Sequence, residues 1–547
     1  MEYYDYTQPF ASRRSPVMGM RGAVATSHPL AAQAGLRMLL AGGNAVDAAI
    51  ATAAALVVLE PTSCGLGGDA FAIVWDDGEM HGLNASGRAP EALSAEAFRR
   101  AGMAKMPTEG WAPVTVPGVV SAWSALSRRF GSLPFREVMA PAIEYAREGA
   151  PVPPVIAGYW SAAQKRFGGR GGVFEEFGRT FLPGGRAPLP GEVYRNPELA
   201  TTLQSIAESH GESFYRGSLA RAIAVHSEAT GGFVALRDLA EHLPEWVEPV
   251  KARYRGFEVW EIPPNGQGIV ALMALNVMEG FDLAAAPRLA PESFHVIIEA
   301  LRLAFADAHA YVGDPRAVAV PVHELLSPEY AAARRAQISL SGAMADVAPG
   351  RLSGKQETWE PRDGDTVYLC AADWEGMMVS YIQSNYMGFG SGVVVPGTGI
   401  SMQNRGAGFS LEEGHPNELA PGRRPFHTII PGFLTQSGVP LAAFGVMGGD
   451  MQPQGHVQVI SSIIDHSLNP QAAIDCPRVR VVGADGVLAE PEVGADTIAA
   501  LRRLGHNIRA EEGRAGFGGG QMVWRNPDTG VLIAGSEPRK DGCAVAI

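Results

Sequence analysis

Lysine and arginine are too few in this chain to form a nucleic-acid-binding surface. The 547 residues contain 44 Lys and Arg against 57 Asp and Glu, which gives a formal net charge of −13. No run rich in Lys or Arg interrupts that balance. Because positive charge dominates binding to nucleic acids and to anionic membranes, the composition argues against both as the main partner.

Long apolar segments are also missing. The most apolar stretch, residues 48–59, lies between Asp47 and Glu60. It is shorter than the roughly 20 residues that a membrane-spanning helix needs. The N-terminal residues contain no apolar segment of the kind found in a secretory signal. We therefore expect a soluble, cytoplasmic protein.

Cysteine is scarce and forms no CxxC motif, which argues against a zinc knuckle or a thioredoxin-type site. The four cysteines are Cys64, Cys370, Cys476 and Cys543. His456 and His466 have no acidic partner at metal-ligand spacing. We expect free buried thiols, no metal site and no cofactor.

The hydrophobic content of 46% is sufficient for a large core, and the length alone predicts two to four domains. Residues 1–28 predict an irregular arm that leads into a strand at 22–26. Residues 28–59 predict two close-packed helices separated at residues 42–44. A strand at 70–75 and a turn at 76–78 predict a hairpin. Residues 92–345 predict mainly helices, including 135–148 and 291–312, with a tight loop at 263–268.

From Thr366 onward the pattern changes to strands. Residues 367–372 and 378–384 predict one hairpin, and residues 521–524 and 531–534 predict another. Strands near both ends with helices between them predict a central pair of sheets covered by helices. Taken alone, Thr366 is an ordinary β-branched residue at the start of a strand.

Several short motifs then follow one another in a specific order. They are Gly22-Ala-Val-Ala-Thr-Ser-His-Pro-Leu-Ala31, Gly42-Gly-Asn-Ala-Val-Asp-Ala-Ala49, Cys64-Gly-Leu-Gly-Gly-Asp69, Val116-Pro-Gly118, Ala304-Phe-Ala-Asp307, Gly313-Asp-Pro315, Gly388-Phe-Gly-Ser-Gly392 and Met447-Gly-Gly449. Through them, over nearly its whole length, the chain resembles the γ-glutamyltransferase family. The resemblance implies an α+β fold, a four-layer αββα sandwich of the N-terminal-nucleophile hydrolase type.

In that family the precursor cuts its own backbone before a threonine, and the matching residue is Thr366. The resemblance implies cleavage between Asp365 and Thr366, giving a large chain (1–365) and a small chain (366–547) intertwined in one domain. A dimer of such two-chain units is left open. A Thr hydroxyl needs a base nearby. The α-amine freed by cleavage, with an ordinary pKa of about 7.7–8.0, can take the hydroxyl proton.

The resemblance also assigns the groups around the nucleophile. Ser384 matches the position whose hydroxyl bonds to the nucleophile. Gly448 and Gly449 match the pair whose backbone N–H groups stabilise the oxyanion, a task that glycine suits because the backbone can approach the substrate closely.

The substrate pocket departs from the family pattern. The Arg that holds the α-carboxylate of a γ-glutamyl group is replaced by Ser86, with Arg88 two residues further on. The acidic position that takes the α-amine falls on Gly408, and a nearby Gln is replaced by Arg405. The loop at 411–423 is shorter than the lid of many relatives. The other residues assigned to the pocket are Asn404, Tyr386, His427 and Thr428.

A pocket that has lost its amine partner and gained a cation favours a small anionic amide. The runs at 382–392 and 396–406 look like the branch of the family that includes oxamate amidohydrolase. We predict that the enzyme hydrolyses oxamate to oxalate and ammonia, and that Arg405 or Arg88 holds the carboxylate. Three alternatives stay open: a γ-glutamyl hydrolase or transferase, an acylase for larger amides, and a relative that binds ligands without catalysis.

Overall fold

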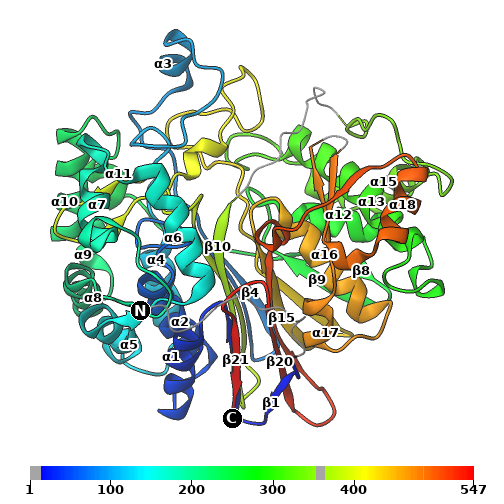
Figure 1. The fold of residues 1–547 in the computed structure, drawn as a ribbon, viewed down its shortest axis with the longest axis horizontal. Helices are drawn as coiled ribbons and strands as arrows, with labels where there is room; N and C mark the ends of the chain where they lie inside the picture. Colours follow the sequence, from blue (N-terminus) through cyan, green and yellow to red (C-terminus); the bar gives the residue numbers. More distant parts are fainter. Residues whose placement is uncertain (1–13, 353–363, 484–485) are drawn as a thin grey trace.

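Two seven-stranded sheets run through the centre of the protein, for which the computed structural model describes residues 14–352, 364–483 and 486–547 (Figure 1). We name each sheet after one of its central strands. The β10 sheet has the order β21 (Cys543–Ala546), β2 (Gly22–Thr26), β10 (Asp365–Asp373), β11 (Met378–Tyr386), β3 (Asp69–Asp76), β4 (Glu79–Ala85) and β7 (Glu245–Val247). The β15 sheet has the order β1 (Val17–Gly19), β20 (Leu532–Ser536), β19 (Gly519–Arg525), β15 (Val439–Met447), β14 (Gly432–Gln436), β9 (Phe257–Glu261) and β8 (Val250–Tyr254).

The two sheets pack face to face, and β10 is buried on both of its faces. Tyr368 and Cys370 belong to the apolar cluster between the sheets, together with Phe433 of β14. Val367 and Leu369 belong to the cluster on the opposite face. Since successive side chains of a strand point to opposite faces, this assignment follows from the twofold alternation along β10.

Helices cover the outer face of each sheet (Figure 1). On the β10 sheet these are α1 (Pro29–Leu40), α2 (Ala45–Leu59) and α4 (Val119–Phe130), and α5 (Phe135–Glu148) packs on α2. On the β15 sheet they are α12 (Gly268–Met278), α16 (Met451–Ile464) and α17 (Pro470–Asp475), and α13 (Pro291–Tyr311) packs on α12. All of α2 is buried. Its many alanines allow α1 to approach so closely that a Cβ at Gly35 would lie 2.3 Å from Thr52 Oγ1.

The remaining elements form the periphery. The helices are α3 (Ala95–Arg100), α6 (Pro154–Phe167), α7 (Glu175–Phe181), α8 (Pro197–Ser209), α9 (Glu212–Tyr215), α10 (Ser218–Ala229), α11 (Leu236–Ala240), α14 (Val322–Leu325), α15 (Pro328–Arg335) and α18 (Ala495–Arg503). The small sheets pair β5 (Ala150–Pro151) with β6 (Val193–Tyr194), β12 (Val394–Val395) with β13 (Ile400–Ser401), and β17 (Gly486–Ala489) with β16 (Val479–Val482) and β18 (Asn507–Ala510).

Most elements expected from the sequence are present. The break at residues 42–44 is a helix start at which the Asn44 side chain accepts hydrogen bonds from the backbone N–H groups of Val46 and Asp47. All three predicted hairpins form, β3 with β4, β10 with β11, and β19 with β20. The region 92–345 also contains β5 to β9, which the prediction of a mainly helical region missed. These strands are only two to five residues long, so the alternating pattern along them is weak.

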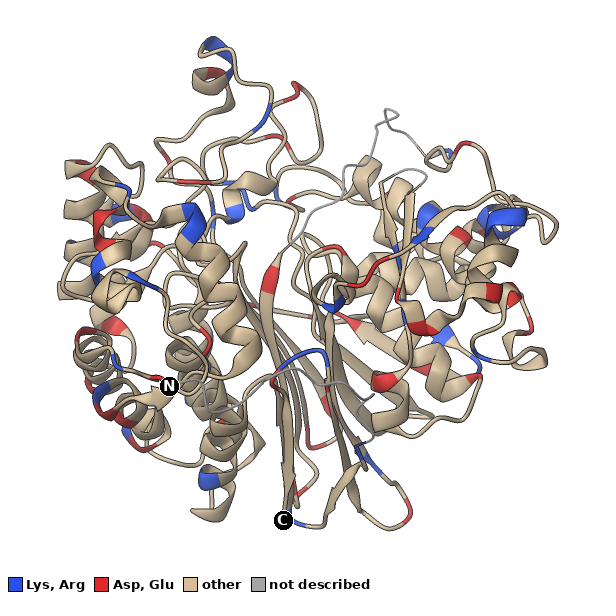
Figure 2. Cartoon of the chain, in the orientation of Figure 1, with Lys and Arg blue, Asp and Glu red and all other residues tan. Residues whose placement is uncertain are grey.

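Charged residues lie mostly on the helices and loops around the sheets (Figure 2). This distribution agrees with the charged content of only 18%, since the buried strands take up a large part of the chain. Among the helices of the described ranges, none has the length and apolarity needed to cross a membrane.

Candidate active site

Thr366 lies at the start of β10 and is 1% exposed. Its hydroxyl Oγ1 donates to Ser384 Oγ at 3.3 Å. Ser384 Oγ in turn donates to the carbonyl oxygen of Asp365 at 2.7 Å and accepts from the backbone N–H of Tyr386 at 2.7 Å. The register between β10 and β11 shifts here, so that Ser384 and Asn385 lie opposite the single residue Thr366. This bulge directs the Ser384 hydroxyl to the peptide bond before Thr366.

The glycine pair lies where β15 ends and α16 begins. Gly448 has φ +127° and Gly449 has φ +58°, a region of backbone conformation that favours glycine. A Cβ on Gly364, two residues before Thr366, would lie 3.3 Å from the Cα of Gly449. The turn therefore lies beside the peptide bond between Asp365 and Thr366. It also forms the positive end of α16, which favours negative charge.

Gln267 connects this glycine turn to the predicted substrate pocket. Its side-chain Nε2 donates to the carbonyl oxygen of Gly449 at 2.9 Å and to that of Thr428 at 2.6 Å. The residue is fully buried in the loop before α12. The sequence indicated a tight loop here but gave no sign that this side chain joins two distant segments.

Arg405 and Tyr386 lie together in the pocket. The Arg405 guanidinium is 4.2 Å from the centre of the Tyr386 ring, and its Nη1 donates to Thr428 Oγ1 at 2.6 Å. Arg405 is 1% exposed. Asn404, the residue before Arg405, is held in place because its side-chain oxygen accepts from the backbone N–H of Met387 at 3.1 Å. Tyr386 is paired with Asp365 across the hairpin, so the guanidinium lies close to the cleavage site.

His427 is a buried, neutral residue next to this guanidinium. Its Nε2 lies 3.0 Å from Asp69 Oδ2. Burial, followed by the positive charge of Arg405, lowers the pKa of His427 to about 3, against the opposing effect of Asp69. At neutral pH the ring is therefore uncharged and donates Nε2–H to Asp69.

Ser86 and Arg88 take part in other contacts. Ser86 Oγ donates to Asn84 Oδ1 at 2.7 Å. The Arg88 guanidinium lies 3.0 Å from Glu245 and 3.6 Å from Asp314. The structure thus brings Thr366, Ser384, Tyr386, Arg405, Thr428 and Gly449 into one connected group. Arg88 instead belongs to a separate charged cluster, in which Glu245 also pairs with Arg316 and Arg424.

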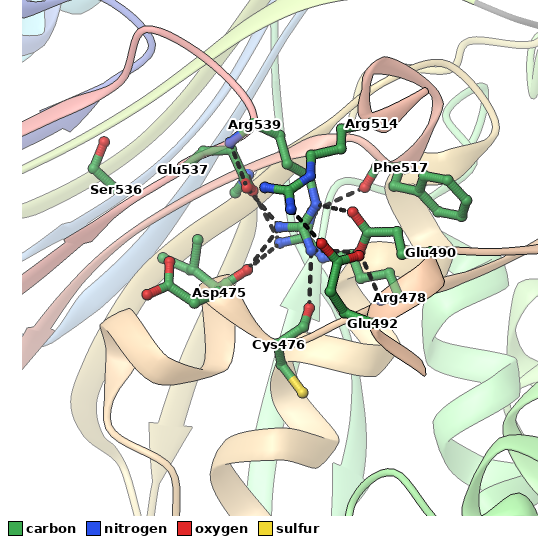
Figure 3. Close-up of polar contacts among 12 residues, drawn as sticks. Asp475, Cys476, Arg478, Glu490, Glu492, Arg514, Phe517, Ser536, Glu537 and Arg539 are labelled. Carbon is green, nitrogen blue, oxygen red and sulfur yellow. Dashed lines mark hydrogen bonds and ion pairs between the residues drawn. The ribbon is translucent and has the colours of Figure 1, made fainter. Parts of the chain in front are cut away.

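A buried ion-pair network joins Arg478, Glu490, Glu537 and Arg539 (Figure 3). Glu537 accepts from Arg478 Nη2 at 2.9 Å and from Arg539 Nη1 at 2.6 Å, and Arg539 also pairs with Glu490. Glu537 accepts from the backbone N–H of Gly520 as well, at 2.6 Å. The adjacent Gly518 packs so closely that a Cβ on Gly448 would lie 3.1 Å from its Cα. The network therefore fixes the backbone against which Gly448 rests.

Replacing Glu537 by Gln is expected to lower the free energy of unfolding by about 2–3 kcal/mol, because two buried guanidinium groups lose a charged partner. Burial opposes ionisation of Glu537, but Arg478 and Arg539 outweigh it and lower its pKa. The difference in unfolding free energy between the variant and the unchanged protein should therefore have its full size at neutral pH. It should shrink as the pH falls below the ordinary glutamate pKa of about 4.3. Urea unfolding at several pH values measures this.

The matched control is Glu492→Gln, which removes the charged partner of Arg514 in a surface ion pair. The Glu492 side chain is 41% exposed. This change should cost within about 0.5 kcal/mol. Equal losses in the two variants would contradict a structural role for the buried network.

Comparison with known proteins gives consistent matches along the chain. The sequence profile described as gamma-glutamyltranspeptidase matches residues 31–547. The glutathione hydrolase-like YwrD proenzyme of Bacillus subtilis is 36% identical, covering 97% of this chain and 99% of the relative. The oxamate amidohydrolase proenzyme of Klebsiella pneumoniae is 35% identical, covering 96% and 98%. The crystal structure of cephalosporin acylase from Bacillus halodurans superposes with a TM-score of 0.94 at 52% identity, covering 100% of this chain and 99% of that one.

Fold, site and these matches together define an amide-bond hydrolase. Both curated relatives are proenzymes, which implies that this chain also is a precursor processed into two chains. The chain belongs to the gamma-glutamyltranspeptidase family. The similar relatives differ in their named activities, so the predicted oxamate branch is one of several to which the chain is related.

Proposed function

We propose that this protein is a self-processing threonine amidohydrolase with a four-layer αββα fold, and that its substrate is an amide whose acyl part carries a carboxylate but no amine, such as oxamate. The contact that supports this most directly joins the Thr366 hydroxyl, through Ser384, to the carbonyl of Asp365. That carbonyl belongs to the bond that self-cleavage would break.

Self-cleavage follows from this geometry in two steps. Thr366 Oγ1 attacks the Asp365 carbonyl carbon while the Ser384 hydroxyl polarises the carbonyl oxygen. The bond to the Thr366 nitrogen breaks, the hydroxyl proton ends on that nitrogen, and an ester forms. The Thr366 amine is then free, and water hydrolyses the ester, which restores the Thr366 hydroxyl and leaves a carboxylate on Asp365.

The processed enzyme repeats this chemistry on its substrate. The free Thr366 amine takes the proton of Oγ1, and Oγ1 attacks the amide carbon of the substrate. Backbone N–H groups of Gly448 and Gly449, at the positive end of α16, stabilise the oxyanion. The amine returns the proton to the leaving nitrogen, and water releases the acid.

Arg405 supports the choice of an anionic substrate. A planar guanidinium pairs with a carboxylate through two parallel hydrogen bonds. The buried position of Arg405 strengthens such a pair, because less water screens it. Arg88 suits this role less well, since its contacts with Glu245 and Asp314 lie outside the group of side chains connected to Thr366. We therefore propose Arg405 for the carboxylate.

An acylase for larger amides is the second candidate. The similarity to the cephalosporin acylase structure, at 52% identity over the whole chain, favours it. A γ-glutamyl substrate agrees less well with the pocket, because the position expected to take its α-amine is Gly408. A cytoplasmic location and a dimer of two-chain units remain predictions.

A substrate panel on the processed enzyme tests this proposal. The panel contains oxamate, longer amides with a terminal carboxylate, a γ-glutamyl anilide and neutral acyl amides. The proposal requires the highest kcat/KM among the carboxylate-bearing amides, and the chain length preferred separates an oxamate hydrolase from an acylase. Faster turnover of the γ-glutamyl anilide or of a neutral amide would contradict it.

Ser384→Ala should slow self-cleavage by about tenfold to a hundredfold, because the Asp365 carbonyl loses its side-chain donor. The fraction of cut chain against time, followed on a denaturing gel, measures this. Ser380→Ala is the matched control on the same strand, where Ser380 Oγ bonds to the Tyr368 hydroxyl between the sheets. Equally slow cleavage in both variants would attribute the effect to packing.

A further inference from the structure

Gln452 lies in the first turn of α16 and is fully buried. Its side-chain Nε2 is 3.4 Å from Thr366 Oγ1 and donates to it. The Thr366 hydroxyl thus accepts from Gln452 on one side and donates to Ser384 on the other. The mechanism described above makes no use of this donor.

The orientation of the Gln452 amide is determined by a second contact. Its Oε1 accepts from the backbone N–H of Ile430 at 3.0 Å. A backbone N–H is only a donor, so the amide oxygen must face Ile430 and the NH₂ group must face Thr366. A flipped amide would place its NH₂ group against another donor.

Gln452 is also attached to the glycine turn. Its backbone N–H donates to the carbonyl oxygen of Gly449 at 3.2 Å. The backbone donors expected for the oxyanion and this side-chain donor therefore belong to one rigid unit at the start of α16. Gln452 lies next to the nucleophilic oxygen, whereas the N–H groups of the glycine pair are expected to donate to the carbonyl oxygen of the substrate.

We propose that Gln452 is a catalytic residue that stabilises Thr366 Oγ1 as this oxygen loses its proton, an inference that rests on the proposed function. The proton passes to the base, the Oγ1 electron pair forms the bond to the carbonyl carbon, and Gln452 gives up no proton. An N–H···O bond strengthens when its acceptor becomes negative. The contact therefore stabilises the transition state more than the resting state.

The same donor acts in the second half of the reaction. In the ester, Oγ1 is a weak acceptor because its electrons are shared with the carbonyl. When water displaces Oγ1, negative charge returns to it, and the Gln452 amide again stabilises this charge. Loss of Gln452 should lower kcat and leave KM nearly unchanged, because the residue contacts the nucleophile.

Gln452→Glu tests this with little change in shape. The carboxylate keeps an acceptor for Ile430 but removes the donor to Thr366. We expect self-cleavage, and kcat on oxamate, to fall about tenfold to a hundredfold at neutral pH. Both should recover in part at lower pH, because a protonated Glu is again a donor. Cleavage does not depend on the choice of substrate.

Gln458→Glu is the matched control on the same helix. Its amide bonds to the backbone of Val479 at 2.9 and 3.0 Å, away from Thr366. It should lower the melting temperature without the kcat loss or the recovery at low pH. If Gln452→Glu does not fold, Gln452→Met replaces it, with the same loss of rate and no recovery at low pH.

Several outcomes overturn the inference. Normal cleavage and kcat in Gln452→Glu, with an uncut Thr366→Ala chain, would remove the catalytic role of Gln452 and leave the proposed function intact. A loss that is the same in Gln452→Glu and Gln458→Glu, with no pH recovery, would reduce the role to packing. Cleavage and activity in Thr366→Ala would instead refute the proposed function itself.

Discussion

Thr366→Ala is expected to leave a single 57.8 kDa chain with no measurable amidase activity. The substitution removes the hydroxyl that both self-cleavage and substrate hydrolysis require, while a buried Ala is compatible with the start of β10. In a comparable hydroxyl-nucleophile hydrolase, loss of the nucleophile costs on the order of 10⁶-fold in kcat. A denaturing gel and an oxamate assay measure the two effects separately.

Thr366→Ser is the conservative control for this experiment. It retains a hydroxyl that can donate to Ser384 and accept from Gln452. We expect it to cut and to hydrolyse, at reduced rates, since the lost methyl group no longer restricts the side chain. Cleavage at the same bond in Thr366→Ala would show that another group attacks the Asp365 carbonyl, and the nucleophile assignment would then be wrong.

Local signals made much of the fold predictable. Asn44 ends one run of small apolar residues and caps the next helix, so the α1–α2 pair could be placed from the sequence alone. The β10–β11 hairpin follows from two mainly apolar runs around a polar turn. The strands β7 and β9 were missed because they pair with β4 and β14, which lie far away in the chain, and no local pattern records such pairing. The hairpin of β8 with β9 is local, but its strands are short.

The candidate site was less predictable than the fold, since its connections join distant segments. Gln267 and Gln452 are ordinary glutamines in the sequence, and only the folded chain brings them to Gly449 and Thr366. The charged run 537–541 looks like a surface turn, yet Glu537 and Arg539 are buried in an ion-pair network (Figure 3). A buried charge depends on partners that tertiary structure supplies.

The residue that binds the substrate carboxylate also could not be chosen from the sequence alone. The sequence left both as candidates for the carboxylate, because each lies near a position that the family uses. Their contacts separate them, since Arg88 neighbours two carboxylates whereas Arg405 stacks on Tyr386 and bonds to Thr428. The side chains around each guanidinium, which only the folded chain brings together, distinguish the two residues.

Arg405→Ala is expected to lower kcat/KM for oxamate by about 10²–10³-fold while self-cleavage continues. Truncating one partner of a buried charge pair costs roughly 2–5 kcal/mol, and each 1.4 kcal/mol corresponds to a factor of ten. Self-cleavage requires no external carboxylate, so the cut chains should still appear on a denaturing gel. Steady-state kinetics on the processed variant measures the loss.

The carboxylate assignment can be separated from a general effect on the pocket. Oxamide replaces the carboxylate of oxamate with a neutral amide, so its turnover should change far less in Arg405→Ala. Arg88→Ala is the matched control, because it removes a guanidinium paired with Glu245 and should leave the preference for oxamate over oxamide intact. If Arg88→Ala loses that preference and Arg405→Ala keeps it, the carboxylate binds at Arg88, and the contacts of Arg405 serve to position Tyr386 and Thr428.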